Sequence, residues 1–245
     1  MKLLFALSIV LVSAVSATPI THGTTSDIIQ RGTPTVRDPS SVQETVSLCT
    51  QYAYYAANGY EVLNNLWGKD TATSGSQCTY YEGAVGSGIK WSSTWSWQGA
   101  QDNVKSYVYA GRQLTKGNTI AKIKTMPTQI NWSYNTTSNV RANVAYDIFT
   151  AQDPNHINTT VTIAGYKFDL YFGYNGSMQV FSFVRSGNDL TSFNADVKLF
   201  FNYLVTSQQF PESTQNLIVY QIGTEAFTGG PVKFSVSNFS ATLST

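Results

Sequence analysis

The sequence predicts an all-β sandwich with one short helix, and three observations lead to this fold class. Short segments in which apolar and polar residues alternate recur along the chain, as they do in half-buried strands. Turn-forming residues are frequent, with 18 Gly in 245 residues. Only residues 195–204 space their apolar side chains at helical intervals. Many short antiparallel strands with a single helix favour a sandwich over layered α/β folds.

The clearest predicted strand is residues 140–150. Its even positions are apolar, whereas Arg141, Asn143 and Asp147 form a polar series. The other predicted strands are residues 130–134, a hairpin of 166–172 and 178–184 with Asn-Gly in its turn, and 217–222, ended by Gly223. The helix is expected near residues 195–205, with Asn194 as its N-cap.

Composition excludes several classes of protein. The 15 basic and 14 acidic residues leave no positive field for binding nucleic acid. With 5 Trp, 15 Tyr and 13 Phe, the chain has ample apolar surface to bury, so disorder is not expected for most of it. Two His and two Cys leave little room for a zinc site. We therefore expect no metal, no cofactor and a monomer.

The first residues indicate export. Lys2 precedes an apolar run, residues 3–15, and small residues follow up to Ala17, which together are typical of a secretory signal and too short for a membrane span. We predict a signal peptide at 1–17, a linker or pro-segment at 18–47, and one domain at 48–245 of a secreted, extracellular protein. Sequons for N-glycans occur at Asn131, Asn135, Asn158, Asn175 and Asn238.

Cys49 and Cys78 are the two cysteines of the chain. In an exported protein they are most simply interpreted as one disulfide near the start of the domain. The alternative is a pair of free buried thiols.

Two carboxylates are candidates for chemistry. Glu225 lies in the stretch 223–229, among aromatic and small residues that can raise the pKa of a carboxyl group. Asp147 lies within a predicted strand, where Asp is unusual. For each residue the simpler alternative is a solvated surface charge.

Six blocks occur in order and together resemble glycoside hydrolase family 12, the small secreted endo-β-1,4-glucanases and xyloglucanases. The blocks are NNLWG at 64–68, WSSTWSW at 91–97, NVKSY at 103–107, NVAYDIFT at 143–150, YNGSM at 174–178 and GTEAFTG at 223–229. The resemblance runs from about Leu48 to the end of the chain. It implies a jelly-roll sandwich of two antiparallel sheets with a concave cleft, and a retaining mechanism that uses two Glu residues.

The resemblance also implies roles for individual residues. Glu225 matches the general acid/base, with Ala226 where Pro is common, and Asp147 matches the Asp that orients the nucleophile. Asn65 and Trp67 match residues that contact the sugar, and Tyr52 stands where relatives often have a cleft Trp. Cys49 and Cys78 match the family's N-terminal disulfide. Trp95 and Trp97 are candidates for an aromatic cleft floor, with core packing as the alternative.

The strand that carries the nucleophile in the family has no counterpart in this sequence. Residues 155–160 run directly into 161–166, which resemble the family's next hairpin. Asp153, Asp169, Asp189, Asp196 and Glu212 are the remaining carboxylates between Asp147 and Glu225, and none lies in a matching motif. Double displacement requires two carboxyl groups about 5–5.5 Å apart, so we expect the reaction to be impaired.

Three explanations follow from this gap. The first is a secreted hydrolase of β-1,4-glucan or xyloglucan that has lost its nucleophile strand, or whose printed sequence omits an exon. The second is an inactive protein that binds glycan or acts as a decoy for an inhibitor of an active relative. The third, a structural wall protein, does not account for Glu225 in its motif.

Overall fold

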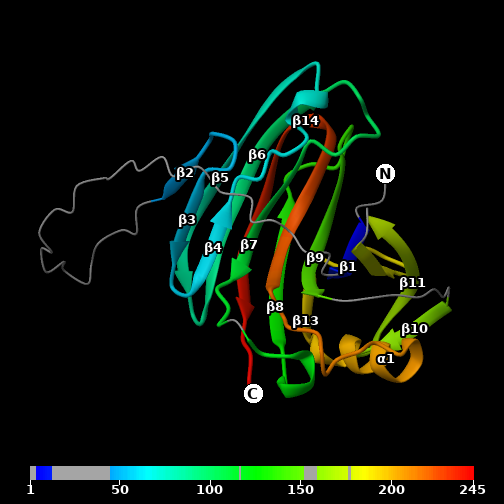
Figure 1. Ribbon diagram of the computed structural model, residues 1–245. Helices are drawn as coiled ribbons and strands as arrows, with labels where there is room; N and C mark the ends of the chain where they lie inside the picture. Colours follow the sequence, from blue (N-terminus) through cyan, green and yellow to red (C-terminus); the bar gives the residue numbers. More distant parts are fainter. Residues whose placement is uncertain (1–3, 13–44, 116, 152–158, 176–177) are drawn as a thin grey trace, which may run out of the picture.

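The computed structural model describes residues 4–12, 45–115, 117–151, 159–175 and 178–245. Strands dominate, and α1 (Lys198–Gln208) is the α-helix of these residues (Figure 1). Two short 3-10 turns, η1 (Lys69–Thr71) and η2 (Ile120–Lys122), lie in connections. The all-β class predicted from the sequence is confirmed.

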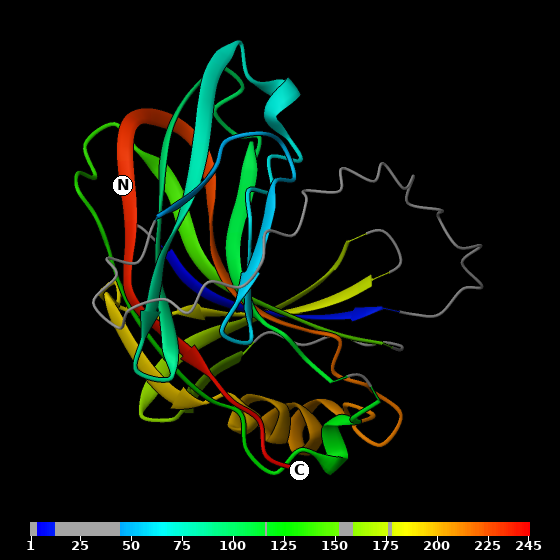
Figure 2. The same ribbon diagram turned by 90° about the vertical axis from the view of Figure 1, so that its left-hand side faces the viewer.

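The first sheet has nine strands and curves across the molecule (Figure 2). Its order is β3 (Tyr54–Ala57), β4 (Tyr60–Leu63), β7 (Ser106–Arg112), β14 (Val219–Ala241), β9 (Arg141–Ala151), β1 (Leu4–Val12), β12 (Met178–Arg185), β11 (Tyr166–Asn175) and β10 (Thr159–Ile163).

The second sheet packs against the first and is antiparallel throughout its described pairs. Its order is β2 (Val46–Leu48), β5 (Ser74–Val85), β6 (Gly88–Gln98), β14, β8 (Pro127–Tyr134) and β13 (Ser192–Asp196). The two curled antiparallel layers form the jelly-roll sandwich that the resemblance implied.

Strand β14 belongs to both sheets. Its first part pairs with β7 and β9, and its second part pairs with β6 and β8. Gly229 and Gly230 lie at the change of sheet with φ of 119° and 88°, which side chains other than glycine rarely adopt. The predicted strand end at Gly223 is therefore wrong, because glycine here continues a strand.

The predicted helix is present but begins later than expected. Residues 192–196 form β13, and the side chain of Asp196, not Asn194, accepts a hydrogen bond from the N–H of Lys198 at 2.9 Å. The same carboxylate accepts a bond from the N–H of Met126 at 2.7 Å. Phe200 packs edge-on against Phe168 and Phe183, so the helix covers the core-side face of β11 and β12.

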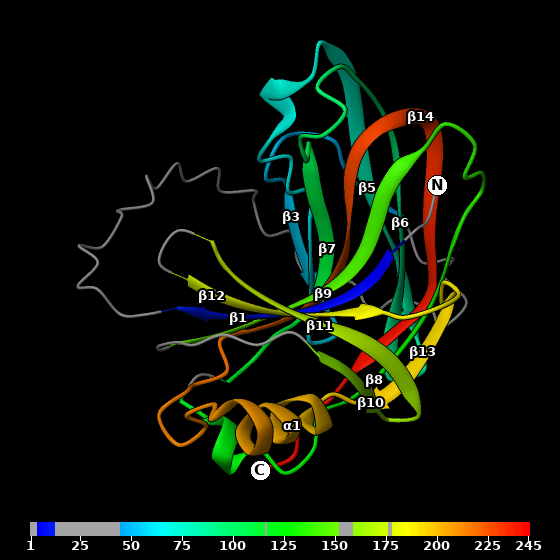
Figure 3. The same cartoon turned by 90° about the vertical axis from the view of Figure 1, so that its right-hand side faces the viewer.

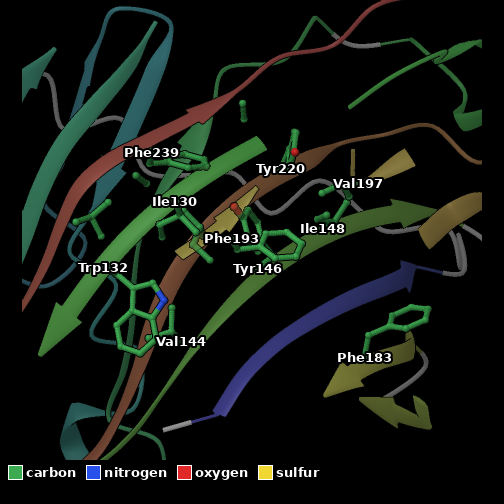
Figure 4. Packing of buried hydrophobic residues seen from close by; sticks show 14 of the residues in the cluster. Ile130, Trp132, Val144, Tyr146, Ile148, Phe183, Phe193, Val197, Tyr220 and Phe239 are labelled. Atoms are coloured by element: carbon green, nitrogen blue, oxygen red, sulfur yellow. The ribbon is translucent and has the colours of Figure 1, made fainter. Parts of the chain in front are cut away.

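The hydrophobic core lies between the two sheets and extends to the helix (Figure 4). Strand β9 shows how the sequence produces it: Val144, Tyr146 and Ile148 are fully buried, while Asn143 and Asp147 stand on the opposite face. Tyr146 also shares a hydrogen bond with Thr128 at 2.8 Å. The alternation predicted for residues 140–150 is thus confirmed.

The N-terminal segment forms a strand. Leu4–Val12 is β1 and lies between β9 and β12 in the first sheet (Figure 3). It runs parallel to β9, whereas the other strand pairs of the described residues are antiparallel. Most of the predicted linker at 18–47 falls outside the described residues, and β2 begins at Val46, two residues before the predicted domain start. No helix within the described ranges is long and apolar enough to span a bilayer.

Candidate active site

Glu225 lies within β14, on the face of the first sheet that points away from the core. Its register partners are Tyr107 on β7 and Asn143 on β9. Its neighbours in the chain, Thr224 and Ala226, point inward and are fully buried. The strand therefore directs the Glu225 side chain to the face of the first sheet opposite the core, where the resemblance implies a cleft.

Asn143 holds the Glu225 carboxyl group in place. Its side-chain N–H donates to Oε2 of Glu225 at 2.5 Å, and its Oδ1 accepts from the backbone N–H of Glu225 at 3.2 Å. Burial raises the pKa of Glu225, and the bond from Asn143 opposes that rise by stabilising the carboxylate. A raised pKa keeps the acid protonated to higher pH, as a proton donor to a leaving oxygen requires.

Asp147 lies on the same face of β9, in register with Gln221 of β14. Burial, together with the smaller effect of the negative charge of Glu225, raises the pKa of Asp147 to about 8. Asp147 is four residues along β9 from Asn143, which is about 13 Å of strand. The backbone therefore places Asp147 well away from Glu225 rather than opposite it.

Tyr107 forms the floor between these two carboxyl groups. Its hydroxyl donates to the carbonyl of Ala145 at 3.0 Å, and its ring stacks on that of Tyr109. Burial raises the pKa of Tyr107 well above its usual value, and the charges of Asp147 and Glu225 add to the rise. The phenol therefore stays neutral and acts as a hydrogen-bond donor.

Gly223 leaves the space that Tyr107 occupies. A Cβ at this position would lie 2.4 Å from the carbonyl oxygen of Val108 and 2.8 Å from the Tyr107 ring. We expect Gly223→Ala to lower the free energy of unfolding by about 2–4 kcal/mol, because backbone and ring must both shift. Urea unfolding measures this. Gly173→Ala on β11, with nothing within 4 Å, is the control, and an equal effect of both substitutions would contradict the explanation.

The predicted sugar contacts Tyr52, Asn65 and Trp67 lie close together in sequence before and after β4. Tyr52 is 54% exposed and Trp67 is 52% exposed, so both rings are open to solvent. The carbonyl of Asn65 accepts from the N–H of Tyr107 at 2.9 Å, which ties this segment to the strand beside Glu225. These positions suit contact with a ligand in the cleft.

Trp95 and Trp97 do not line the cleft, which corrects their assignment as a cleft floor. They are 2% and 3% exposed and lie in the core between the sheets. The indole N–H of Trp97 donates to the Gln77 side chain at 3.0 Å, and Trp95 packs edge-on against Tyr134. Core packing, the alternative kept from the sequence, is the role of both residues.

Lys105 and Tyr171 are residues that sequence reasoning missed. Lys105 is fully buried and donates to three carbonyl oxygens, those of Ala100, Asn103 and Phe227. It thereby fastens residues 100–105 to β14 just after Glu225. Tyr171 of β11 is 52% exposed, and its register partner is Ser182. A lone Lys inside the 103–107 block was the available signal for the first of these residues.

Besides Glu225 and Asp147, the described strands of the first sheet carry two carboxylates, Glu61 and Asp169, and the sheet places neither beside Glu225. Glu61 on β4 accepts a bond from the Tyr54 hydroxyl at 3.2 Å, and its register partner Gly111 is four residues from Tyr107, about 13 Å along β7. Asp169 lies four strands from β14, which is about 19 Å across the sheet. Strands β1 and β12 contain neither Asp nor Glu.

The remaining expectations divide into three groups. The disulfide between Cys49 and Cys78 is present. Across the described ranges, no group of three His, Cys, Asp or Glu side chains could hold a metal ion. Of the sequons, Asn135 is exposed, Asn131 and Asn238 are half-buried, and Asn158 and the side chain of Asn175 lie outside what the structure describes.

Comparison with known proteins finds relatives that are all glycoside hydrolases. The chain is 38% identical to xyloglucan-specific endo-beta-1,4-glucanase A of Emericella nidulans, over 84% of this chain and 94% of the relative. It is 40% identical to inactive glycoside hydrolase XLP1 of Phytophthora nicotianae, over 80% and 91%. The crystal structure of the Humicola grisea Cel12A catalytic domain, in complex with a thio cellotetraose, superposes with a TM-score of 0.77 at 48% identity, covering 81% of this chain and 99% of that domain.

The alignments also locate an interruption. The alignment to the Emericella nidulans relative spans 229 positions, yet it covers 84% of 245 residues, about 206, so about 23 positions have no counterpart here. The family pattern matches in two parts, residues 58–162 and 156–244, which meet where the nucleophile strand is missing from the sequence. Together these two parts cover most of the chain, and the protein belongs to glycosyl hydrolase family 12.

Proposed function

We propose that this chain is a secreted protein of the endo-β-1,4-glucanase and xyloglucanase type, which binds plant cell-wall β-1,4-glucan or xyloglucan and whose hydrolytic step is impaired. The observation that carries the proposal is the site itself. Glu225 is held by Asn143 as a general acid should be, while the strand position beside β9 is filled by a segment without a carboxylate. Export is supported by residues 1–17 and by the disulfide.

The chemistry explains why hydrolysis is impaired. In double displacement one carboxylate attacks the anomeric carbon while the other protonates the leaving oxygen. Glu225 can supply the proton, but attack needs a carboxylate about 5–5.5 Å away. Asp147, which by resemblance orients the nucleophile, has Ser8 as its register neighbour on β1. We therefore expect at most trace release of reducing sugar from β-glucan and xyloglucan, and release at the rate of an active relative would contradict the proposal.

A second candidate function is an inactive glycan-binding or decoy protein. The observation that favours it is the 40% identity to a relative named as an inactive glycoside hydrolase. The two candidates share the glycan-binding cleft and differ in whether any turnover remains. Sugar release measured in the wild type and in Glu225→Gln separates them, because residual catalysis depends on the Glu225 acid and binding alone does not produce sugar.

Binding is expected to depend on the exposed aromatic side chains of the cleft. Trp67→Ala should weaken the affinity for cellotetraose about 5- to 10-fold, because the indole presents a flat face to the C–H groups of a glucose ring. Isothermal titration calorimetry measures the change. Tyr174→Ala is the control, since Tyr174 is 58% exposed but packs with Phe172 on the opposite face of β11. A loss of affinity in the control alone would disprove the assignment.

A further inference from the structure

The strand position between β9 and β12 is filled from a distant part of the chain. β1 pairs with β9 over nine residues and with β12 over six. Residues 13–45 connect β1 to β2, and such a connection can span up to ~110 Å. The tether therefore does not force the segment into this position, and the pairing must reflect a fit between the segment and the two strands (Figure 3).

The large residues at the centre of the segment occur at the register positions of the core. Val144, Tyr146 and Ile148 of β9 are fully buried. The residues of β1 in register with them are Phe5, Leu7 and Ile9, in that order. In a sheet, residues in register lie on the same face, so these positions call for large apolar residues.

The small residues at the centre of the segment occur at register positions of the opposite face, which Leu4, Val10 and Val12 share. Ala6 is in register with Ala145, and Ser8 is in register with Asp147. On the other side, Ser8 is in register with Ser182 of β12. A slip by one residue would exchange the large and small residues at positions 5–9, so the alternation over these positions favours this register.

We propose that the sheet contains an acceptor site for one extended strand between β9 and β12, and that the N-terminal segment Leu4–Val12 is its occupant. The strand missing from the sequence would lie between β9 and β10 along the chain, and the segment pairs backbone groups of β9 and β12 that an empty site would leave open. When export removes residues 1–17, the site opens and binds the same segment in trans.

The first test uses the full chain, produced without export so that it keeps residues 1–17. Ser8→Pro removes a backbone N–H from the middle of β1 and should lower Tm by about 5–10 °C. Amides of β9 and β12 that pair with β1 should lose protection from hydrogen exchange, while those that pair with β14 and β11 keep it. Thr24→Pro, between β1 and β2, is the control. Unchanged Tm and unchanged exchange in Ser8→Pro would overturn the proposal.

The second test needs no variant of the protein. The intact mass of the secreted protein shows whether residues 1–17 have been removed. To that shortened form we add a peptide of residues 4–12 with two lysines at each end for solubility. Tm should rise by several degrees. A control peptide in which Phe5 is exchanged with Ala6 and Leu7 with Ser8 should have no effect. No shift, or equal shifts with both peptides, would overturn the proposal. If the secreted protein retains residues 4–12, this result supports the proposal that the segment occupies the acceptor site of its own chain.

Discussion

Inserting the missing strand and its loop between Asn158 and Val161 is expected to raise sugar release from xyloglucan about 10⁴-fold or more. The inserted segment is taken from the Emericella nidulans relative, whose alignment leaves about 23 positions in total without a counterpart here. Removal of a covalent nucleophile can cost on the order of 10⁶-fold in kcat, as it does in a serine protease, so its return should recover a large part of such a loss. Reducing-sugar assays on β-glucan and xyloglucan measure the gain.

A matched control isolates the carboxylate from the effect of completing the sheet. The same insertion with its Glu changed to Gln restores the strand but not the nucleophile, and should remain at the level of the wild type. If both insertions were equally active, the missing strand would matter for packing and not for chemistry. If neither insertion were active although folded, the impairment would lie elsewhere in the cleft.

Stability is expected to fall as pH rises from about 4 to about 8, and Asp147 is the cause. Its folded pKa of about 8 lies above its unfolded value, so within this window the folded chain holds a proton that the unfolded chain has released. Its contribution is full below pH 4 and is lost as pH rises through the folded pKa. The free energy of unfolding should decrease by up to about 1.4 kcal/mol for each pH unit.

Asp147→Asn provides the comparison for this prediction. Asn has nearly the shape of a protonated Asp but does not titrate, so the variant should be more stable at pH 7 by a few kcal/mol and should lack this slope. Urea unfolding of both proteins from pH 4 to pH 8 gives the difference, in which other titrating groups cancel. Parallel curves for the two proteins would show that Asp147 is ionised in the folded state at neutral pH.

Local sequence patterns predicted strands correctly where one face of the strand is buried along its length and the other face is not. The alternation in 140–150 predicted β9, and the apolar runs around Asn175-Gly176 predicted β11 and β12. The extent of β14 was not predictable in the same way. Gly223 usually marks a strand end, but here it makes room for the Tyr107 ring, which comes from a strand more than 100 residues earlier.

The site residues were predicted from motifs, and the incorrect predictions among them have a physical cause. Glu225 and Asp147 lie on the same face of the first sheet, opposite the core, and Trp67 is exposed. Trp95 and Trp97 do not, because spacing by two shows only that both share a face, not which of the two faces is buried. Lys105 was missed because its partners are carbonyl oxygens, and these carry no signal in the sequence.

The N-terminal segment illustrates a different ambiguity. An apolar run with one preceding Lys is typical of an export signal, and the same run, with large and small residues alternating, is suited to a two-faced strand. Only the strand position between β9 and β12 distinguishes an export signal from a sheet strand, and that position is a property of the whole sheet. Its pairing with both neighbours therefore could not be inferred from the segment alone.

Recovery of the ligand after binding tests the central claim most directly. The protein is titrated with cellotetraose or a xyloglucan oligosaccharide, and the sugar is then released and analysed by mass spectrometry. If Glu225 lacks an attacking partner, the oligosaccharide should bind saturably and should be recovered intact. The incubation time is one in which an active relative degrades the same oligosaccharide. Shorter sugars formed at a comparable rate would show that a second reactive group works beside Glu225 and would contradict this account.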